Sequence, residues 1–156
     1  MVQMRLKYPL NVFFECINCG LCCRDTESHR RKIILTLKDV EGIANVSHKS
    51  PKEFCRVTHA APKPFCRVMK KTSGSCPFLA GNSMCTIYDS RPLICRCYPF
   101  TVDYEGTNSI AFTTSSKECP GLGRGRRLPE EFFEKLAQEV TRDFESCEKP
   151  RSNSGY

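Results

Sequence analysis

The clearest hydrophobic pattern in the chain lies towards its C-terminal end. Between Pro129 and Glu148, apolar side chains recur at steps of three and four residues, and most of the other positions are polar or charged. This spacing predicts an amphipathic helix with one buried face. The residues of that face are Phe133, Leu136, Ala137, Val140, Phe144 and Cys147.

The same spacing returns over a shorter stretch after Thr36. It predicts a helix that ends at Val46, with the Thr36 hydroxyl as its N-cap and Asp39 in its first turn. The apolar positions of this helix are Leu37, Val40, Ile43 and Ala44. Two shorter helices are predicted as well, one over residues 53–57 after a Ser-Pro pair, and one that opens at residues 89–92 and runs through Cys95.

Short apolar runs bounded by turn residues predict the strands of the protein. Single strands are expected over residues 12–14, 33–35 and 65–71. Two hairpins are expected, one joining residues 76–79 to 84–88 and the other joining 100–104 to 109–114. The alternating glycines at 121, 123 and 125 indicate a flexible loop. These elements predict an α+β fold with one domain, residues 1–148, and a polar tail, residues 149–156, that we expect to be disordered.

Cysteine is the residue type that sets this chain apart, with 12 among 156 residues. Four of them fall within the eight residues that begin at Cys16 and end at Cys23. Gly20, in the middle of this stretch, can adopt the left-handed conformation that a tight turn requires. Thiolates held this close together repel one another unless a cation lies between them. The cluster therefore indicates a zinc or iron–sulfur site.

The surroundings of the cysteines favour metal ligation over disulfides. The N-terminal segment has no apolar run followed by a small-residue cleavage site, and no stretch is apolar enough over the eighteen or so residues that a membrane span needs. We therefore expect a cytoplasmic protein with no membrane partner, in which thiols stay reduced. Disulfides between such close neighbours would also be strained.

Eight cysteines are the predicted metal ligands, enough for two sites of four thiolates each. Those outside the first cluster lie at predicted turns or element ends, where a side chain can reach a metal. The eight are Cys16, Cys19, Cys22, Cys23, Cys76, Cys85, Cys95 and Cys119. Cys97 could replace Cys95, although a small buried hydrophobic residue is the favoured interpretation. We expect core or surface thiols at Cys55, Cys66 and Cys147, and solvent-exposed loop positions for His29, His48 and His59.

Two further groups of polar residues have alternative interpretations. Asp89, Arg91 and Tyr98 surround the third cysteine motif, where they could line the metal or could serve in capping, at the surface and in the core. The basic residues at 30–32 and those at 124, 126 and 127 could bind nucleic acid. The net charge of +7 falls once thiolates bind metal, and no aromatic residues alternate with these arginines. Nucleic acid is therefore disfavoured as a partner, and a solvated surface is favoured.

The cysteine motifs resemble those of the YkgJ-type cysteine-cluster family, which is described as a zinc- or iron-chelating domain. The resemblance rests on FECINCGLCC at 14–23, CPFL at 76–79, CTIY at 85–88, RP at 91–92, CR at 95–96, YPF at 98–100 and CPG at 119–121. It implies metal chelation and covers roughly residues 12–125. Flagellin lysine N-methylases are similar in the cysteine motif and are associated with an iron–sulfur cluster.

The expected function is chelation of an iron–sulfur cluster, of the 4Fe-4S type, or of zinc through the clustered thiolates. Short hairpins and helices would be arranged around that metal centre, and a protein partner for it is possible. Two alternatives stay open, which are an iron–sulfur-dependent protein-lysine N-methyltransferase-like enzyme and a zinc-stabilised nucleic-acid-binding module. The enzyme alternative has little support, because the glycines at 121–125 follow no predicted strand that would make them a cofactor-binding loop.

Overall fold

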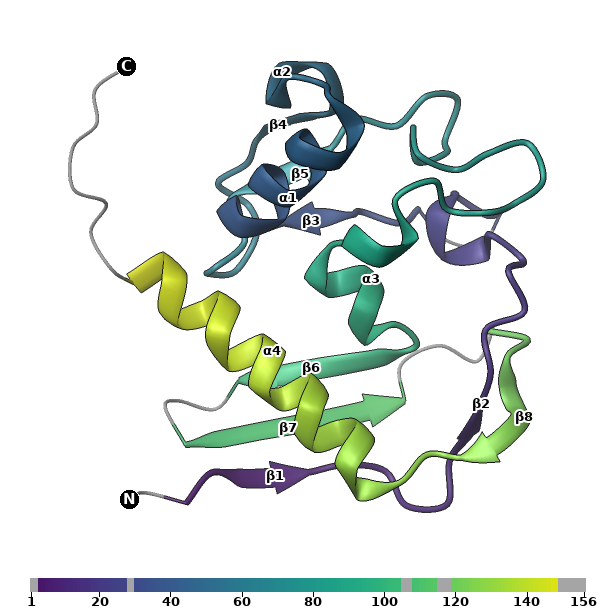
Figure 1. Ribbon diagram of the computed structural model, residues 1–156, viewed down its shortest axis with the longest axis vertical. Helices are drawn as coiled ribbons and strands as arrows, with labels where there is room; N and C mark the ends of the chain where they lie inside the picture. The colour runs from purple at the N-terminus through teal and green to yellow at the C-terminus, as the bar shows by residue number, and fades with distance from the viewer. Residues whose placement is uncertain (1–2, 28–29, 105–107, 115–118, 149–156) are drawn as a thin grey trace.

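The computed structural model describes residues 3–27, 30–104, 108–114 and 119–148, so the predicted tail lies outside it. The described residues form three small sheets and four α-helices, so the fold is α+β as expected (Figure 1). The strands are β1 (Arg5–Lys7), β2 (Phe13–Phe14), β3 (Ile34–Leu35), β4 (Cys55–Val57), β5 (Arg67–Met69), β6 (Phe100–Tyr104), β7 (Ser109–Thr114) and β8 (Leu122–Arg127). The α-helices are α1 (Leu37–Ser47), α2 (Pro51–Phe54), α3 (Leu93–Cys97) and α4 (Glu130–Glu148), and two 3-10 helices are η1 (Leu21–Cys23) and η2 (Tyr88–Ser90).

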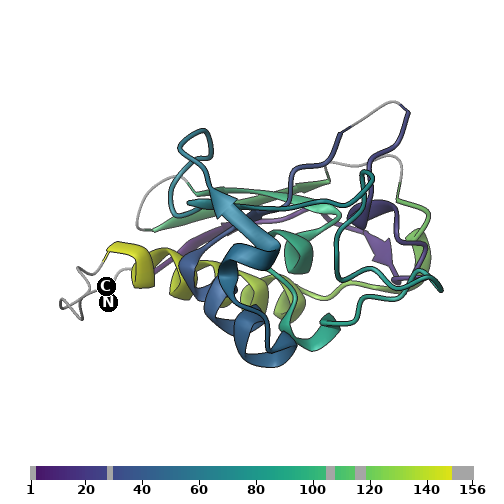
Figure 2. The same cartoon turned by 90° about the horizontal axis from the view of Figure 1, so that it is seen from above.

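The first hydrophobic core lies under the antiparallel sheet β3-β5-β4, with α1 and α2 beside it in Figures 1 and 2. α1 begins where it was predicted to begin. The Thr36 hydroxyl accepts the Asp39 backbone N–H at 3.1 Å, and the Asp39 carboxylate accepts the Thr36 backbone N–H at 2.9 Å. This capping box satisfies two N–H groups that a helix start otherwise leaves without partners.

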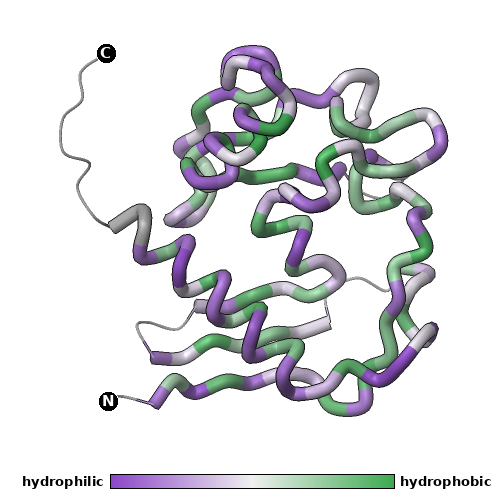
Figure 3. The backbone as a smooth tube through the Cα atoms, viewed as in Figure 1, coloured by the Kyte–Doolittle hydropathy of each residue, from purple (hydrophilic) through white to green (hydrophobic). Residues whose placement is uncertain are grey.

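The second core lies between α4 and the sheet β1-β7-β6. β6 and β7 form the predicted hairpin, and β1 adds to its free edge in parallel. α4 packs against this sheet with the predicted face, and Phe133, Ala137 and Val140 are fully buried there. Purple and green alternate along α4 in Figure 3, as expected for a helix with one buried face. The side chain of Cys147, predicted to belong to that face, lies outside the described part.

Several predicted elements differ from the structure. The glycine-rich segment is strand β8, which pairs antiparallel with β2, and the predicted loop was therefore wrong. The predicted helix at 53–57 lies earlier, as α2, and Cys55–Val57 form strand β4 instead. α3 starts at Leu93, after the predicted opening at residues 89–92, and residues 89–90 belong to η2. Residues 76–88 form turns with one bridge between Leu79 and Cys85 rather than a regular hairpin.

Helices of sufficient length and apolarity to cross a membrane do not occur among the described residues.

Candidate metal centre

The segment that carries the first four cysteines begins at a close approach of two strands. β2 pairs with β8, and the Glu15 backbone N–H donates to the Gly121 carbonyl at 3.1 Å. A Cβ atom at Gly121 would lie 2.4 Å from the Glu15 carbonyl oxygen, so only glycine permits this approach. Cys16 follows Glu15 directly, and Cys119 precedes Gly121 by two residues. The pairing therefore brings cysteines from distant parts of the chain to one place.

Gly20 turns the chain between the second and third cysteine. Its φ of 74° lies in the left-handed region, as predicted, and it precedes η1, which carries Cys22 and Cys23. A Cβ atom at this position would lie 2.6 Å from Nη2 of Arg24. The left-handed backbone therefore favours glycine, and a larger residue would also have to displace the Arg24 guanidinium.

Arg24 connects the segment at 16–23, which we call the cysteine turn, to the loop at 76–85, which carries Cys76 and Cys85. Its guanidinium donates to the carbonyl oxygen of Cys19 at 2.9 Å, to that of Gly20 at 3.3 Å and to the Ser83 hydroxyl at 3.0 Å. The planar fork of an arginine suits such a multiple contact. No cysteine motif identifies Arg24 or Ser83, which is why the sequence interpretation missed both.

The exit of the turn is fixed by backbone contacts to residues 74–76. Asp25 donates its N–H to the Gly74 carbonyl at 2.7 Å, and Cys76 donates its N–H to the Cys23 carbonyl at 2.7 Å. The Asp25 carboxylate also accepts from Nζ of Lys71 and from the backbone N–H of Arg31. Arg31 is half-buried, with its guanidinium 5.0 Å from the centre of the Tyr98 ring, rather than fully solvated as expected.

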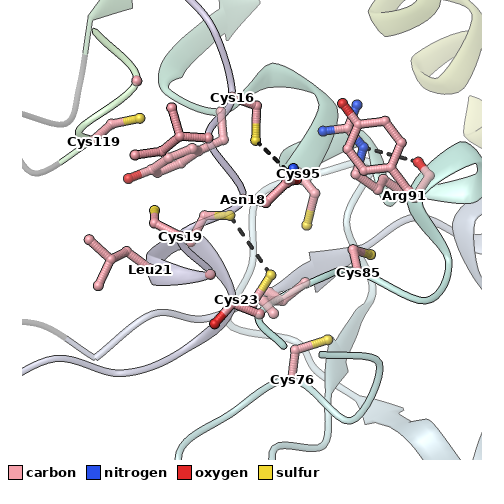
Figure 4. A pocket seen from close by; sticks show the side chains of 18 of the residues that line it. Cys16, Asn18, Cys19, Leu21, Cys23, Cys76, Cys85, Arg91, Cys95 and Cys119 are labelled. Atoms are coloured by element: carbon pink, nitrogen blue, oxygen red, sulfur yellow. Dashed lines mark hydrogen bonds between the residues drawn. The ribbon is translucent and has the colours of Figure 1, made fainter. Parts of the chain in front are cut away.

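All eight predicted ligands line one cavity of about 80 Å³ (Figure 4). They come from the cysteine turn, from the loop at 76–85, from α3 and from the residues just before β8. The other described cysteines do not line it: Cys55 and Cys97 are buried in the two cores, and Cys66 is half-buried elsewhere. His48 and His59 are exposed and lie outside the cavity, and His29 lies outside the described residues.

The remaining lining of the cavity is largely apolar, with Ile33, Met69 and Ile87 from the first core. Arg91 and Tyr98 also line it, whereas Asp89 is exposed. The Arg91 guanidinium lies 4.0 Å from the centre of the Tyr88 ring, and its Nε donates to the Tyr88 carbonyl at 3.0 Å. Arg91 therefore contributes a positive charge to the wall of the cavity.

Burial and mutual repulsion disfavour thiolates in the absence of a cation. Contact with Cys23, 3.8 Å away between Sγ atoms, and then burial, strongly raise the pKa of the Cys22 thiol. Burial raises the pKa of the Cys95 thiol, and charges on Cys22, Cys76 and Cys85 raise it further. Burial likewise raises the pKa of Cys119, with a contribution from Cys19 and Cys22. Cys22 thus interacts with thiols on both sides of the cavity.

The repulsion between these thiolates would be relieved by a cation within the cavity. A bound metal offsets the repulsion and lowers the pKa of a coordinating thiol, so binding would release protons. As they stand, no three His, Cys, Asp or Glu side chains of the described residues are close enough together to hold an ion. The cavity has room for several water-sized atoms. Eight thiols around such a space suit a group of several atoms, or more than one ion, better than one small ion.

Comparison with known proteins supports metal binding by this chain. The model of the family CxxCxxCC, described as "Putative zinc- or iron-chelating domain", matches residues 15–120. The chain is 30% identical over 139 residues to "Uncharacterized protein MJ0661" of Methanocaldococcus jannaschii, and the match covers 85% of this chain and 71% of the relative. No solved structure matches the chain. The matched region contains all eight cavity cysteines, and the chain belongs to the CxxCxxCC family.

Proposed function

We propose that this protein binds zinc or an iron–sulfur cluster through the cysteines of its cavity. The proposal rests on where the described cysteines lie. The eight predicted ligands line one cavity, and Cys55, Cys66 and Cys97 lie outside it. Soft thiolate ligands select zinc and iron–sulfur clusters over hard cations such as magnesium. Bound there, zinc would cross-link the fold, whereas an iron–sulfur cluster, such as a 4Fe-4S cluster, would supply one-electron transfer.

The residues of this chain have separate tasks in that function. The thiols of the cavity hold the metal, and Arg91 places a positive charge beside them, which offsets part of the negative charge of a thiolate-bound centre. Arg24 and Gly20 hold the shape of the cysteine turn. The apolar part of the wall lowers the local dielectric constant, which strengthens these electrostatic interactions.

Ligation by thiolates requires a reducing environment, so we propose that the protein is located in the cytoplasm. The cysteines with described side chains are all free thiols, and the ligands must be reduced to bind metal.

Anaerobic purification followed by metal analysis and an ultraviolet–visible spectrum tests the proposal. Zinc gives stoichiometric metal without visible absorption, and an iron–sulfur cluster gives iron, sulfide and a broad visible band. The Cys95→Ser variant should lose metal, because a hydroxyl is a poor ligand for a soft metal. The matched control, Cys66→Ser, changes a half-buried cysteine outside the cavity and should keep its metal. A folded wild-type protein that binds neither zinc nor iron after reconstitution would overturn the proposal.

A further inference from the structure

The eight cavity cysteines divide into two sets of four by their relation to the first hydrophobic core. Cys76 is buried in that core, and Cys23, Cys85 and Cys95 pack against it. Cys16, Cys19, Cys22 and Cys119 line the cavity without belonging to either core. We name these the inner set and the outer set.

Backbone contacts join some members of each set. In the inner set, Cys76 donates its N–H to the Cys23 carbonyl at 2.7 Å, and Cys85 forms a bridge with Leu79, three residues after Cys76. In the outer set, the contact between Glu15 and Gly121 places Cys16 near Cys119. In Figure 4, Cys16, Cys19 and Cys119 lie towards one end of the view, and Cys76 and Cys85 lie towards the other.

We propose that the cavity contains two metal sites, an inner site of Cys23, Cys76, Cys85 and Cys95 and an outer site of Cys16, Cys19, Cys22 and Cys119. This inference rests on the proposed function. Four thiolates are the complete ligand set of a structural zinc site, so each set suffices for one ion.

The boundary between the sites falls between the neighbours Cys22 and Cys23. Both lie in η1, and in a 3-10 helix successive side chains leave the axis about 120° apart. They therefore start in different directions, although their sulfur atoms lie 3.8 Å apart. The two sites would adjoin at this pair, and Cys22 would be the outer ligand nearest to the inner set.

The two sites should differ in how readily they exchange metal. Cys16 is exposed, and the other members of the outer set are half-buried. The inner set packs in or against the first core: Cys76 is only 8% exposed, and Cys23, Cys85 and Cys95 are half-buried. A ligand can leave a metal at the surface by a local motion, whereas release from the inner site requires opening of packed structure. The outer metal should therefore be lost first.

Zinc release from the full chain tests this inference. The reduced protein is loaded anaerobically with zinc alone, and an excess of a colour-forming chelator is added under native conditions. We expect two zinc ions per chain, released in a fast and a slow phase of one equivalent each. Cys22→Ser should abolish the fast phase and Cys23→Ser the slow phase, although the two residues are adjacent. Cys66→Ser, outside the cavity, should show both phases unchanged.

The outcomes separate this inference from the proposed function. Two zinc ions released in a single phase, one zinc ion per chain, or loss of the same phase in Cys22→Ser and Cys23→Ser would overturn the two-site arrangement while metal binding stands. Absence of any zinc or iron binding would instead overturn the proposed function. If circular dichroism shows that either variant is unfolded, Cys119→Ser and Cys85→Ser replace them, with loss of the fast and the slow phase expected respectively.

Discussion

The carboxylate of Asp39 in α1 accepts the backbone N–H of Leu93, the first residue of α3, at 3.0 Å. Pro92 precedes Leu93 and has no side-chain oxygen that could cap the helix. Asp39 therefore caps two helices, because its other carboxylate oxygen accepts the N–H of Thr36 at the start of α1. α3 carries Cys95, so this carboxylate fixes the helix that presents one of the cavity thiols.

Replacing Asp39 with alanine should destabilise the protein by about 2–4 kcal/mol, since two buried N–H groups lose a charged partner. Arg96 lies 3.8 Å from Asp39 but also pairs with Glu139 at 2.8 Å and Asp143 at 3.2 Å, so it keeps two carboxylate partners in the variant. Urea unfolding of the metal-loaded protein measures the effect. Asn45→Ala, at an exposed position of the same helix, is the control. Equal stability of the two variants would show that α3 needs no cap from α1.

Metal removal should lower the melting temperature sharply. The cavity takes residues from the first core and from the segments next to β2 and β8, so bound metal would link distant parts of the chain. When ligands converge only in the folded state, the free energy of metal binding adds to the stability of that state. Thermal unfolding with and without a chelator, under reducing conditions, measures the change, and added zinc should restore it. An unchanged melting temperature after verified metal removal would contradict this expectation.

Ionised Asp25 stabilises the fold, and this contribution to the unfolding free energy should be lost in acid. Its pKa is lowered, first by the hydrogen bond from Lys71 and then by that from the Arg31 backbone N–H. An acid whose folded-state pKa lies below its unfolded value stabilises the fold above the unfolded pKa, and this contribution is lost as the pH falls through the folded one. Asp25→Asn should therefore flatten the decline in unfolding free energy below the ordinary pKa of 3.8. Asp103→Asn, at an exposed position of β6, is the control, and an equal decline in both variants would contradict the assignment.

Those parts of the fold that depend on local sequence could be predicted. Thr36 and Asp39 have the residue types of a helix start, and the apolar face of α4 repeats over many turns. The hairpin of β6 and β7 also has its own turn residues between two apolar runs. The cavity cysteines could be grouped because thiols of this number and spacing are typical of metal ligands.

The elements that were missed depend on contacts between distant residues. β8 is glycine- and arginine-rich, and five of its six residues are exposed, so no hydrophobic pattern indicates a strand. Only its pairing with β2 makes it one. The contacts of Arg24 with Ser83 and of Asp39 with Leu93 join residues more than 50 positions apart. The sequence could identify the thiols of the cavity, but not the side chains that hold their segments in place.

Nucleic-acid binding should be weak and fully dependent on salt. Arg124, Arg126 and Arg127 are exposed on β8, and three phosphate contacts to a single strand correspond to a slope of log Kobs against log salt of about −2. At physiological salt this gives no tight complex. Fluorescence anisotropy with oligonucleotides of different sequence measures it, and replacing all three arginines with glutamine should remove what binding there is. Tight binding that depends on sequence would favour the nucleic-acid alternative instead.

Gly20 and Arg24 should act as one unit in metal binding. Nη2 of Arg24 donates to the Cys19 carbonyl and to Ser83, and a Cβ atom at Gly20 would lie 2.6 Å from that nitrogen. Gly20→Ala should therefore displace the guanidinium, besides a cost of about 1–2 kcal/mol for the left-handed backbone. Arg24→Lys removes the fork itself, so each variant should weaken zinc binding while the circular dichroism of the helices stays unchanged.

The double variant tests whether the two changes share a cause. Once Arg24 no longer occupies the turn, the methyl group at Gly20 has less to displace, so the losses in zinc affinity should sum to less than the two single effects. Gly81→Ala is the matched control, because nothing lies within 4 Å of a Cβ atom there. It should bind zinc as the wild type does. Additive losses, or an equal loss in Gly81→Ala, would show that the contact of Arg24 with the cysteine turn does not set the shape of the metal centre.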